Sequence, residues 1–160
     1  MNRLIAISGE NGSGKDLVGY IINQLLKDAY EIQKFANCPI RAYKTITGID
    51  FSSLKREDKE LHRHQFIRFC ESIKGVLGQE IYSKKLFQEY TTHCRWIITD
   101  LRFSYEEKEI KDRDGYVFHV TKDGSLNPNL SDPDTIIVNN GSVKDLFENV
   151  RSVLIENNLI

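Results

Sequence analysis

The sequence has few cysteines and no long apolar run. Its three cysteines, Cys38, Cys70 and Cys94, are odd in number and lie far apart, which argues against a disulfide framework and indicates a reducing cytosol. No apolar run approaches the roughly 18 residues that a membrane span requires, and the stretch Leu4–Ile7 is too short for the core of a signal peptide. We therefore expect a cytoplasmic protein with no membrane partner.

The sequence also lacks an excess of charge of either sign. Its 22 Lys and Arg residues stand against 23 Asp and Glu residues, which gives a formal net charge of −1. This balance argues against a protein that coats nucleic acid through its overall charge, so nucleic acid is not an expected partner. With 160 residues, three prolines and no repeat or low-complexity tract to mark a linker, the chain is expected to form one domain, residues 1–160.

Apolar patterning predicts alternating strands and helices. Short apolar runs predict strands at residues 3–8, 31–35, 96–99, 116–120 and 135–138. Helical spacing predicts helices at residues 15–26, 39–47, 105–113 and 142–154, with residues 51–90 mostly helical. We expect Pro39 at the first position of its helix, and Ser142 with Asp145 to form a capping box at the last one. The alternation predicts an α/β fold, a mainly parallel five-stranded sheet flanked by helices in three layers.

The segment Gly9–Lys15 fits the phosphate-binding pattern G-x-x-x-x-G-K and lies between a predicted strand and a predicted helix. Glycines let backbone N–H groups turn around a phosphate, the helix N-terminus adds its positive dipole end, and Lys15 supplies a full charge. The alternative is a glycine-rich turn whose lysine is solvated. The strand–helix context favours a P-loop.

The residue after the lysine departs from the usual pattern, because Asp16 stands where a Ser or Thr hydroxyl normally reaches Mg²⁺. A carboxylate can bind Mg²⁺ directly or through water. It is equally a favourable acid for the first turn of a helix. The sequence leaves both interpretations open.

A second charged pair, Asp100 and Arg102, follows the apolar strand that ends at Thr99. The carboxyl edge of a parallel sheet is where a carboxylate meets a metal–nucleotide complex, and a guanidinium there can bind a second phosphate through two hydrogen bonds. The alternative is a local surface ion pair.

These residues resemble those of the phage-type deoxynucleoside monophosphate kinases, within the P-loop nucleotide kinases. The likeness spans nearly the whole chain, and its most specific parts are Gly14-Lys15-Asp16 and Asp100-Leu101-Arg102-Phe103. Looser matches are Phe35-Ala36 through Gly48-Ile49-Asp50, Leu77-Gly78-Gln79-Glu80, Glu106-Glu107 and Val138-Asn139-Asn140-Gly141-Ser142.

The resemblance implies transfer of the ATP γ-phosphoryl group to a deoxynucleoside 5′-monophosphate, with ATP and Mg²⁺ required, in the host cytoplasm if a phage encodes the protein. It implies catalytic roles for Lys15, Asp100 and Arg102, with Mg²⁺ near Asp16 and Asp100. The residues implied to bind ATP are Gly9, Asn11, Gly12, Ser13, Gly14, Lys15, Asp16 and Leu17. A helical insertion at about residues 39–92 would bind the monophosphate, and the candidate substrate-binding residues are Phe35, Arg41, Lys44, Arg68, Gln79, Glu80 and Arg102.

One feature departs from this family. Its members close an arginine-bearing lid over the phosphates, whereas the lid-like loop expected here, at about residues 121–134, is short, and residues 124–143 contain no Lys, Arg or His. Either Arg41, Arg63 or Arg68 supplies the missing charge, or the protein binds nucleotide and transfers slowly. A P-loop kinase acting on a hydroxyl of a modified nucleic-acid base or of a small metabolite is the other alternative. Apolar helix positions leave a homodimer open.

Overall fold

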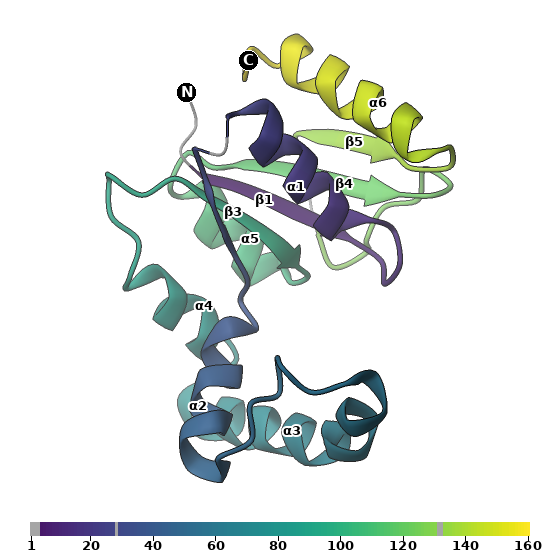
Figure 1. Ribbon diagram of the computed structural model, residues 1–160. Helices are drawn as coiled ribbons and strands as arrows, with labels where there is room; N and C mark the ends of the chain where they lie inside the picture. The colour runs from purple at the N-terminus through teal and green to yellow at the C-terminus, as the bar shows by residue number, and fades with distance from the viewer. Residues whose placement is uncertain (1–3, 28, 131–132) are drawn as a thin grey trace. The chain divides into compact units, whose positions relative to one another are not determined.

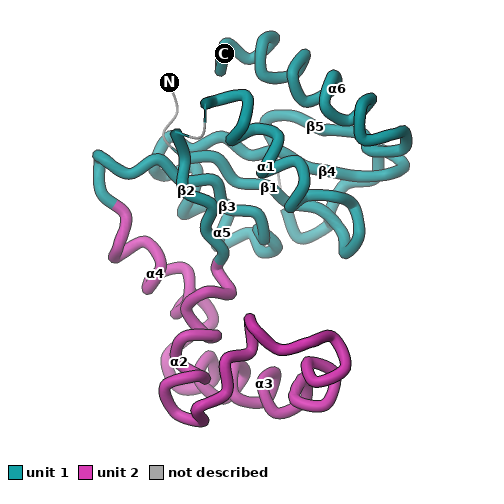
Figure 2. The backbone as a smooth tube through the Cα atoms, in the orientation of Figure 1, with its two compact units in different colours: residues 1–34, 91–160 teal, residues 35–90 magenta. Residues whose placement is uncertain are grey.

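The computed structural model describes residues 4–27, 29–130 and 133–160. The chain forms two compact units, a sheet unit of Met1–Lys34 with Thr91–Ile160, and a helical unit of Phe35–Tyr90 (Figure 2). Among the described residues, none of the helices has both the length and the apolar character that crossing a membrane would require.

The sheet unit is built on five parallel strands in the order β2-β3-β1-β4-β5. The strands are β1 (Leu4–Gly9), β2 (Glu31–Gln33), β3 (Trp96–Leu101), β4 (Tyr116–Thr121) and β5 (Thr135–Val138). Strand β1 is central, with Leu4 opposite Trp96 of β3 and Ile5 opposite Tyr116 of β4. The predicted five-stranded parallel sheet is confirmed, and all its strands end at one edge. Strand β3 runs two residues past its predicted end, so Asp100 lies within the strand and not after it.

Helices cover both faces of this sheet (Figure 1). Helices α1 (Lys15–Leu25) and α6 (Val143–Glu156) pack against each other on one face, and α5 (Ser104–Lys111) packs against β1 and β4 on the other. The chain runs from β1 through α1 toward one edge of the sheet, and from β3 through α5 across β1 toward the opposite edge. Right-handed crossovers in opposite directions place their helices on opposite faces, which produces the three-layer architecture.

The core of the sheet unit lies between β1, α1 and α6. Ile5, Ile7, Ile22, Val150 and Leu154 are fully buried there. Burial of each such side chain contributes about 1.5–3 kcal/mol to stability. The core therefore fixes the start of α1 and the end of β1, between which the glycine-rich loop runs.

The predicted capping box at α6 is confirmed. The Oγ of Ser142 accepts a hydrogen bond from the backbone N–H of Asp145 at 3.2 Å, and an Asp145 carboxylate oxygen accepts from the N–H of Ser142 at 2.8 Å. Two backbone donors that the helix leaves unpaired are satisfied in this way.

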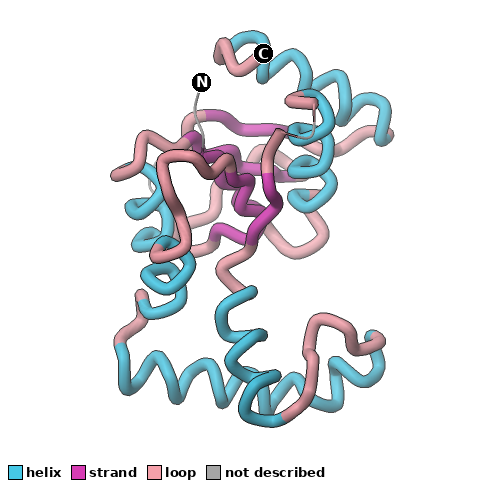
Figure 3. Tube along the Cα trace, turned by 60° about the vertical axis from the view of Figure 1, so that its left-hand side comes forward, coloured by secondary structure: helices cyan, strands magenta, loops and turns pink. Residues whose placement is uncertain are grey.

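The helical unit contains α2 (Asn37–Thr47), α3 (Arg56–Leu77) and α4 (Ile81–Phe87), which Figure 3 shows joined by loops. Its centre is aromatic. The buried ring of Tyr43 meets the rings of Phe66 and Phe69 edge-on, each at 5.3 Å between centroids, and Phe51 stacks on Phe66. Edge-to-face and offset stacking are the favoured geometries for aromatic pairs, so these rings hold α2 against α3.

One prediction in this unit was wrong and another is confirmed. Helix α2 begins at Asn37, which makes Pro39 its third residue; proline is tolerated there because the N–H groups of the first turn have no partner within the helix. The prediction that residues 51–90 are mostly helical is confirmed by α3 and α4. No residue of α3 is buried, and Ile67, Val76 and Leu77 are 47%, 82% and 59% exposed. Helix α3 contacts the rest of its unit through few side chains, which leaves much of its surface open.

Candidate active site

The glycine-rich loop connects the end of β1 to the start of α1 and packs tightly against neighbouring strands. Gly9 has a φ of +152°, and a Cβ atom there would lie 2.4 Å from the carbonyl oxygen of Val120. Gly14, the N-cap residue of α1, has a φ of +95°, and a Cβ atom would lie 2.5 Å from the amide nitrogen of Asn139. The positive φ favours glycine at both positions, and at Gly9 the neighbouring backbone oxygen also leaves no space for a side chain.

Asn139, just after β5, holds this loop from outside. Its side-chain amide donates to the carbonyl oxygen of Ser13 at 2.8 Å, and its own backbone N–H donates to Thr121 of β4 at 2.7 Å. Asn139 belongs to the stretch at residues 138–142, which resembles the deoxynucleoside monophosphate kinases but was given no role from the sequence. The structure gives it one, which is to fix the main chain of the loop.

Ser13 leaves a polar atom for a ligand. Its Oγ is buried and, among the described residues, is the side-chain polar atom that lacks a hydrogen-bond partner within the protein. An unsatisfied buried hydroxyl costs about 1–3 kcal/mol. A ligand oxygen or a water bound at the loop would remove this cost, so the loop fits a polar ligand such as a phosphate.

Lys15 is the first residue of α1 and lies over the loop. Its Nζ donates to the carbonyl oxygen of Glu10 at 3.1 Å. Burial lowers the pKa of Lys15, the Arg102 guanidinium lowers it further, and Asp16 opposes both effects. Lys34 and Asp100 also act on this pKa. Three basic and two acidic side chains are thus close together at the edge of the sheet where β1, β2 and β3 end. They are Lys15, Lys34, Arg102, Asp16 and Asp100.

Asp16 is held by two donors on a single oxygen. Its Oδ1 accepts from the Oγ1 of Thr99 at 2.7 Å and lies 2.9 Å from the Nζ of Lys34. Burial raises the pKa of Asp16, but the hydrogen bonds from Lys34 and Thr99 outweigh it, and the net effect is a lowered pKa. Asp16 therefore stays ionised beside the loop.

Glu106 fixes the segment that carries Arg102. One oxygen of this buried carboxyl, Oε2, accepts from the backbone N–H of Arg102 at 2.9 Å and from that of Phe103 at 3.1 Å. Arg102 itself is exposed, at the edge where β3 ends. The guanidinium is thus presented to solvent from a fixed main chain.

Burial raises the pKa of Glu106 to about 7, and the nearby Asp100 acts in the same direction, against the two backbone hydrogen bonds. The folded protein therefore holds this proton more tightly than the unfolded chain does. Stability should fall as the pH rises from about 4.5 to about 7, because ionisation is then easier in the unfolded chain. We expect Glu106→Gln to remove this loss, worth about 3 kcal/mol.

Urea unfolding of the wild type and of Glu106→Gln at about pH 5 and about pH 8 measures this effect. The variant should gain stability relative to the wild type at the higher pH. Glu109→Gln is the matched control on the same helix, since the Glu109 carboxylate is paired with Arg113. An equal difference between wild type and Glu106→Gln at both pH values would contradict the prediction.

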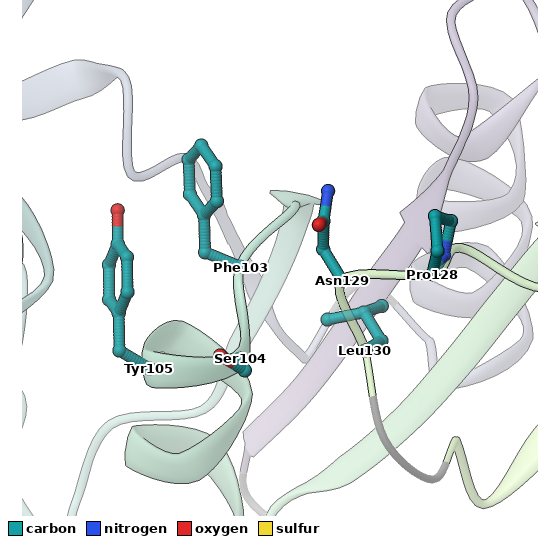
Figure 4. Close-up of a pocket in the computed structure, with 6 residues that line it drawn as sticks. All are labelled: Phe103, Ser104, Tyr105, Pro128, Asn129 and Leu130. Carbon is teal, nitrogen blue, oxygen red and sulfur yellow. The ribbon is translucent and has the colours of Figure 1, made fainter.

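A pocket of about 510 Å³ lies beside Arg102, between the start of α5 and the loop after β4. It is lined by Phe103, Ser104, Tyr105, Pro128, Asn129 and Leu130 (Figure 4). The rings of Phe103 and Tyr105 are nearly parallel, with centroids 5.2 Å apart, and Asn129 lies across from them. The amide of Asn127 donates to the carbonyl oxygen of Arg102 at 3.4 Å, which ties the loop to this segment.

The loop after β4 is the one expected to be lid-like, at about residues 121–134; residues 131 and 132 lie outside the described residues. Its first part is anchored by the buried His119, one ring nitrogen of which lies 2.8 Å from the Oγ of Ser8 and the other 3.0 Å from the carbonyl oxygen of Ser125. This part of the loop is tied to β1 next to the phosphate-binding loop.

The sheet unit contains the residues that the sequence assigned to ATP and Mg²⁺. Gly9 through Asp16 form the loop and the first residues of α1, and Leu17 is 39% exposed in the first turn. Asp16 and Asp100 supply carboxylate oxygens, which Mg²⁺ prefers. Among residues 4–27, 29–130 and 133–160, no group of three or more metal-ligating side chains gathers. Mg²⁺ in kinase sites needs only one or two carboxylates besides substrate phosphates, so the residues present fit it.

The other substrate-binding candidates lie in the helical unit, where several have partners. Arg41 pairs with Glu89 at 3.0 Å, Lys44 with Asp50 at 2.8 Å, and Glu80 with Lys84 at 2.8 Å. Arg68 and Gln79 are exposed, and Phe35 is buried against Phe87. Arg63, one of the alternative sources of positive charge, pairs with Glu60. The roles of these residues stay predictions.

The chain is similar to known kinases in sequence and in structure. The sequence profile described as phosphomevalonate kinase matches residues 7–114, about two thirds of the chain. A solved structure of Mycobacterium tuberculosis APS kinase CysC, a Cys556Ala mutant, superposes with a TM-score of 0.51 over 97% of this chain and 99% of that one, at 12% identity. No curated protein sequence matches the chain. The structural likeness shows a P-loop kinase fold.

Proposed function

This chain belongs to the phosphomevalonate kinase family, and we propose that it transfers the γ-phosphoryl group of ATP to a phosphate monoester. We propose further, on other grounds, that the monoester is a deoxynucleoside 5′-monophosphate. The observation that carries the proposal is that Lys15 and Arg102 lie at the carboxyl edge of one sheet, near enough for the Arg102 guanidinium to lower the pKa of Lys15, together with Asp16 and Asp100. We assign Lys15 to the donor phosphates and Arg102 to the acceptor phosphate.

The proposed reaction needs no strong base. An oxygen of the acceptor phosphate forms a bond to the γ-phosphorus of ATP, the bond from that phosphorus to the bridging oxygen breaks, and ADP leaves with the electron pair. Lys15 and the loop amides bind the donor phosphates, and Arg102 orients the acceptor phosphate. Mg²⁺, held by Asp16 and Asp100, would neutralise charge on the donor phosphates. The enzyme acts mainly by alignment and positive charge.

Two features support a nucleotide acceptor. The sequence resembles that of the deoxynucleoside monophosphate kinases, most closely at Gly14-Lys15-Asp16 and Asp100-Leu101-Arg102-Phe103. The pocket beside Arg102 presents the aromatic faces of Phe103 and Tyr105 together with the amide of Asn129. Aromatic faces stack on planar rings and an amide can bond to a base edge, whereas phosphomevalonate has no ring.

The name of the family favours a second candidate acceptor, phosphomevalonate, which is also a phosphate monoester. Both acceptors require the same chemistry, attack by a phosphate oxygen and formation of a diphosphate. The two candidates therefore differ in how the organic part of the acceptor is bound and not in the reaction.

Incubation with ATP and Mg²⁺ and one acceptor at a time distinguishes these functions. The acceptors are the four deoxynucleoside monophosphates, phosphomevalonate, and DNA that carries modified bases; ADP release gives the rate, and phosphorus NMR identifies the product. We expect a diphosphate from at least one deoxynucleoside monophosphate. Turnover with phosphomevalonate alone supports the second candidate, product only with a hydroxyl acceptor supports the alternative kinase, and ATP binding without any turnover supports a binding module.

A further inference from the structure

Asp16 creates an electrostatic problem for a nucleotide site. The usual phosphate-binding loop has a neutral Ser or Thr after its lysine. Here a carboxylate follows Lys15, in the first turn of α1, where the loop amides and the helix dipole would otherwise attract a polyphosphate. A like charge so close to the ligand opposes its binding unless a cation offsets it.

The sheet brings such a cation to Asp16. Strands β2 and β3 are paired so that Gln33 lies opposite Ile98, and the next residues along them are Lys34 and Thr99. These two side chains are the ones that contact Oδ1 of Asp16, at 2.9 Å and 2.7 Å. Three different elements therefore converge on one carboxylate oxygen.

We propose that Lys34 is a positioning residue of the nucleotide site, which offsets the charge of Asp16 and, together with Thr99, holds Oδ1 so that Oδ2 is left for Mg²⁺ or its water. The proposal rests on the proposed function, because it assumes that the loop binds ATP. It also accounts for the departure from the usual motif: the Asp16 carboxylate stands where a hydroxyl normally reaches Mg²⁺, and the charge that it adds is balanced by Lys34.

Binding of ATP with Mg²⁺, measured by calorimetry without any acceptor, tests this inference through four proteins: the wild type, Lys34→Met, Asp16→Thr and the double variant. Lys34→Met should weaken ATP binding about tenfold, because it leaves the Asp16 charge unbalanced. In the Asp16→Thr background the same substitution should change affinity less than about twofold, since there is no charge left to balance. Lys144→Met, on the exposed side of α6, is the matched control and should bind as the wild type does.

The coupling between the two substitutions decides the outcome. If Lys34→Met weakens ATP equally in both backgrounds, Lys34 contacts the phosphates directly and the inference is overturned. If Lys34→Met binds ATP like the wild type, it is overturned as well. Should Lys34→Met not fold, as judged by circular dichroism, Lys34→Gln replaces it with the same expectation. A wild type that binds no ATP overturns the proposed function itself, which separates the two failures.

Discussion

Lys15→Ala is expected to abolish phosphoryl transfer, lowering kcat/KM for ATP by about 10³-fold or more. Lys15 is the one lysine of the phosphate-binding loop, and its Nζ already lies over that loop, 3.1 Å from the carbonyl oxygen of Glu10. The transferring phosphoryl group carries charge that must be stabilised in the transition state. Backbone amides at a helix N-terminus supply partial charges only, so they cannot replace the ammonium.

The measurement is the steady-state rate of ADP release with the preferred acceptor. Lys144→Ala, a lysine on α6, is the control and should keep the full rate. Lys15 is a half-buried residue in the first turn of α1 and does not belong to the apolar core, so the variant should unfold at nearly the same urea concentration as the wild type. Unchanged turnover in a folded Lys15→Ala protein rejects the assignment of this loop to ATP.

The parts of the fold that could be predicted from sequence are those fixed by local patterns. The run at residues 4–7 is apolar because β1 is buried on both sides, and β5 has the predicted bounds. The capping box consists of two residues three positions apart, Ser142 and Asp145, so it can be recognised without tertiary information. The glycine-rich loop could also be predicted locally, because its motif and the apolar patterns on either side of it lie within one short segment.

Contacts between distant segments could not be predicted in this way. Lys34 meets Asp16 because β2 pairs with β3 in one register, and a shift of one residue would place a different side chain there. Asn139 reaches Ser13 across 126 residues of sequence. Glu106 belongs to a stretch that resembles the kinase family, but its role could not be predicted from the sequence. Its carboxyl group accepts hydrogen bonds from the backbone of Arg102 and Phe103, and these contacts exist only once α5 has formed.

The helical character of α3 could be predicted, but the exposure of its apolar side chains could not. Helical spacing of apolar residues indicates which side chains share a face but not whether another element covers that face. Phe66 and Phe69 meet Tyr43, whereas Ile67 and Val76 remain exposed. The missing quantity is the number of elements packed around the helix, which the sequence of one segment does not contain.

The absence of Lys, Arg and His from residues 124–143 gives the cations of the sheet edge more importance. The transition state of phosphoryl transfer needs positive charge on the donor and acceptor sides. Lys34 is engaged with Asp16 in the structure, so its charge is largely offset there. Arg102 is then the exposed cation at this edge that we propose for the acceptor.

Arg102→Ala should therefore raise KM for the acceptor about 10- to 100-fold while KM for ATP stays close to that of the wild type. A guanidinium binds a phosphate through two parallel hydrogen bonds, and the segment that carries it is fixed by Glu106. Arg102→Lys keeps the charge but loses the paired geometry, so its effect should fall between wild type and alanine.

Initial rates over a matrix of ATP and acceptor concentrations separate the two KM values. Arg151→Ala, an exposed arginine on α6, is the matched control and should leave both unchanged. A rise in KM for ATP with no change for the acceptor would place Arg102 on the donor side and reverse the assignment. Lys15→Ala is expected to affect the donor and Arg102→Ala the acceptor. The two variants together therefore distinguish the residue that binds the donor phosphates from the residue that binds the acceptor phosphate.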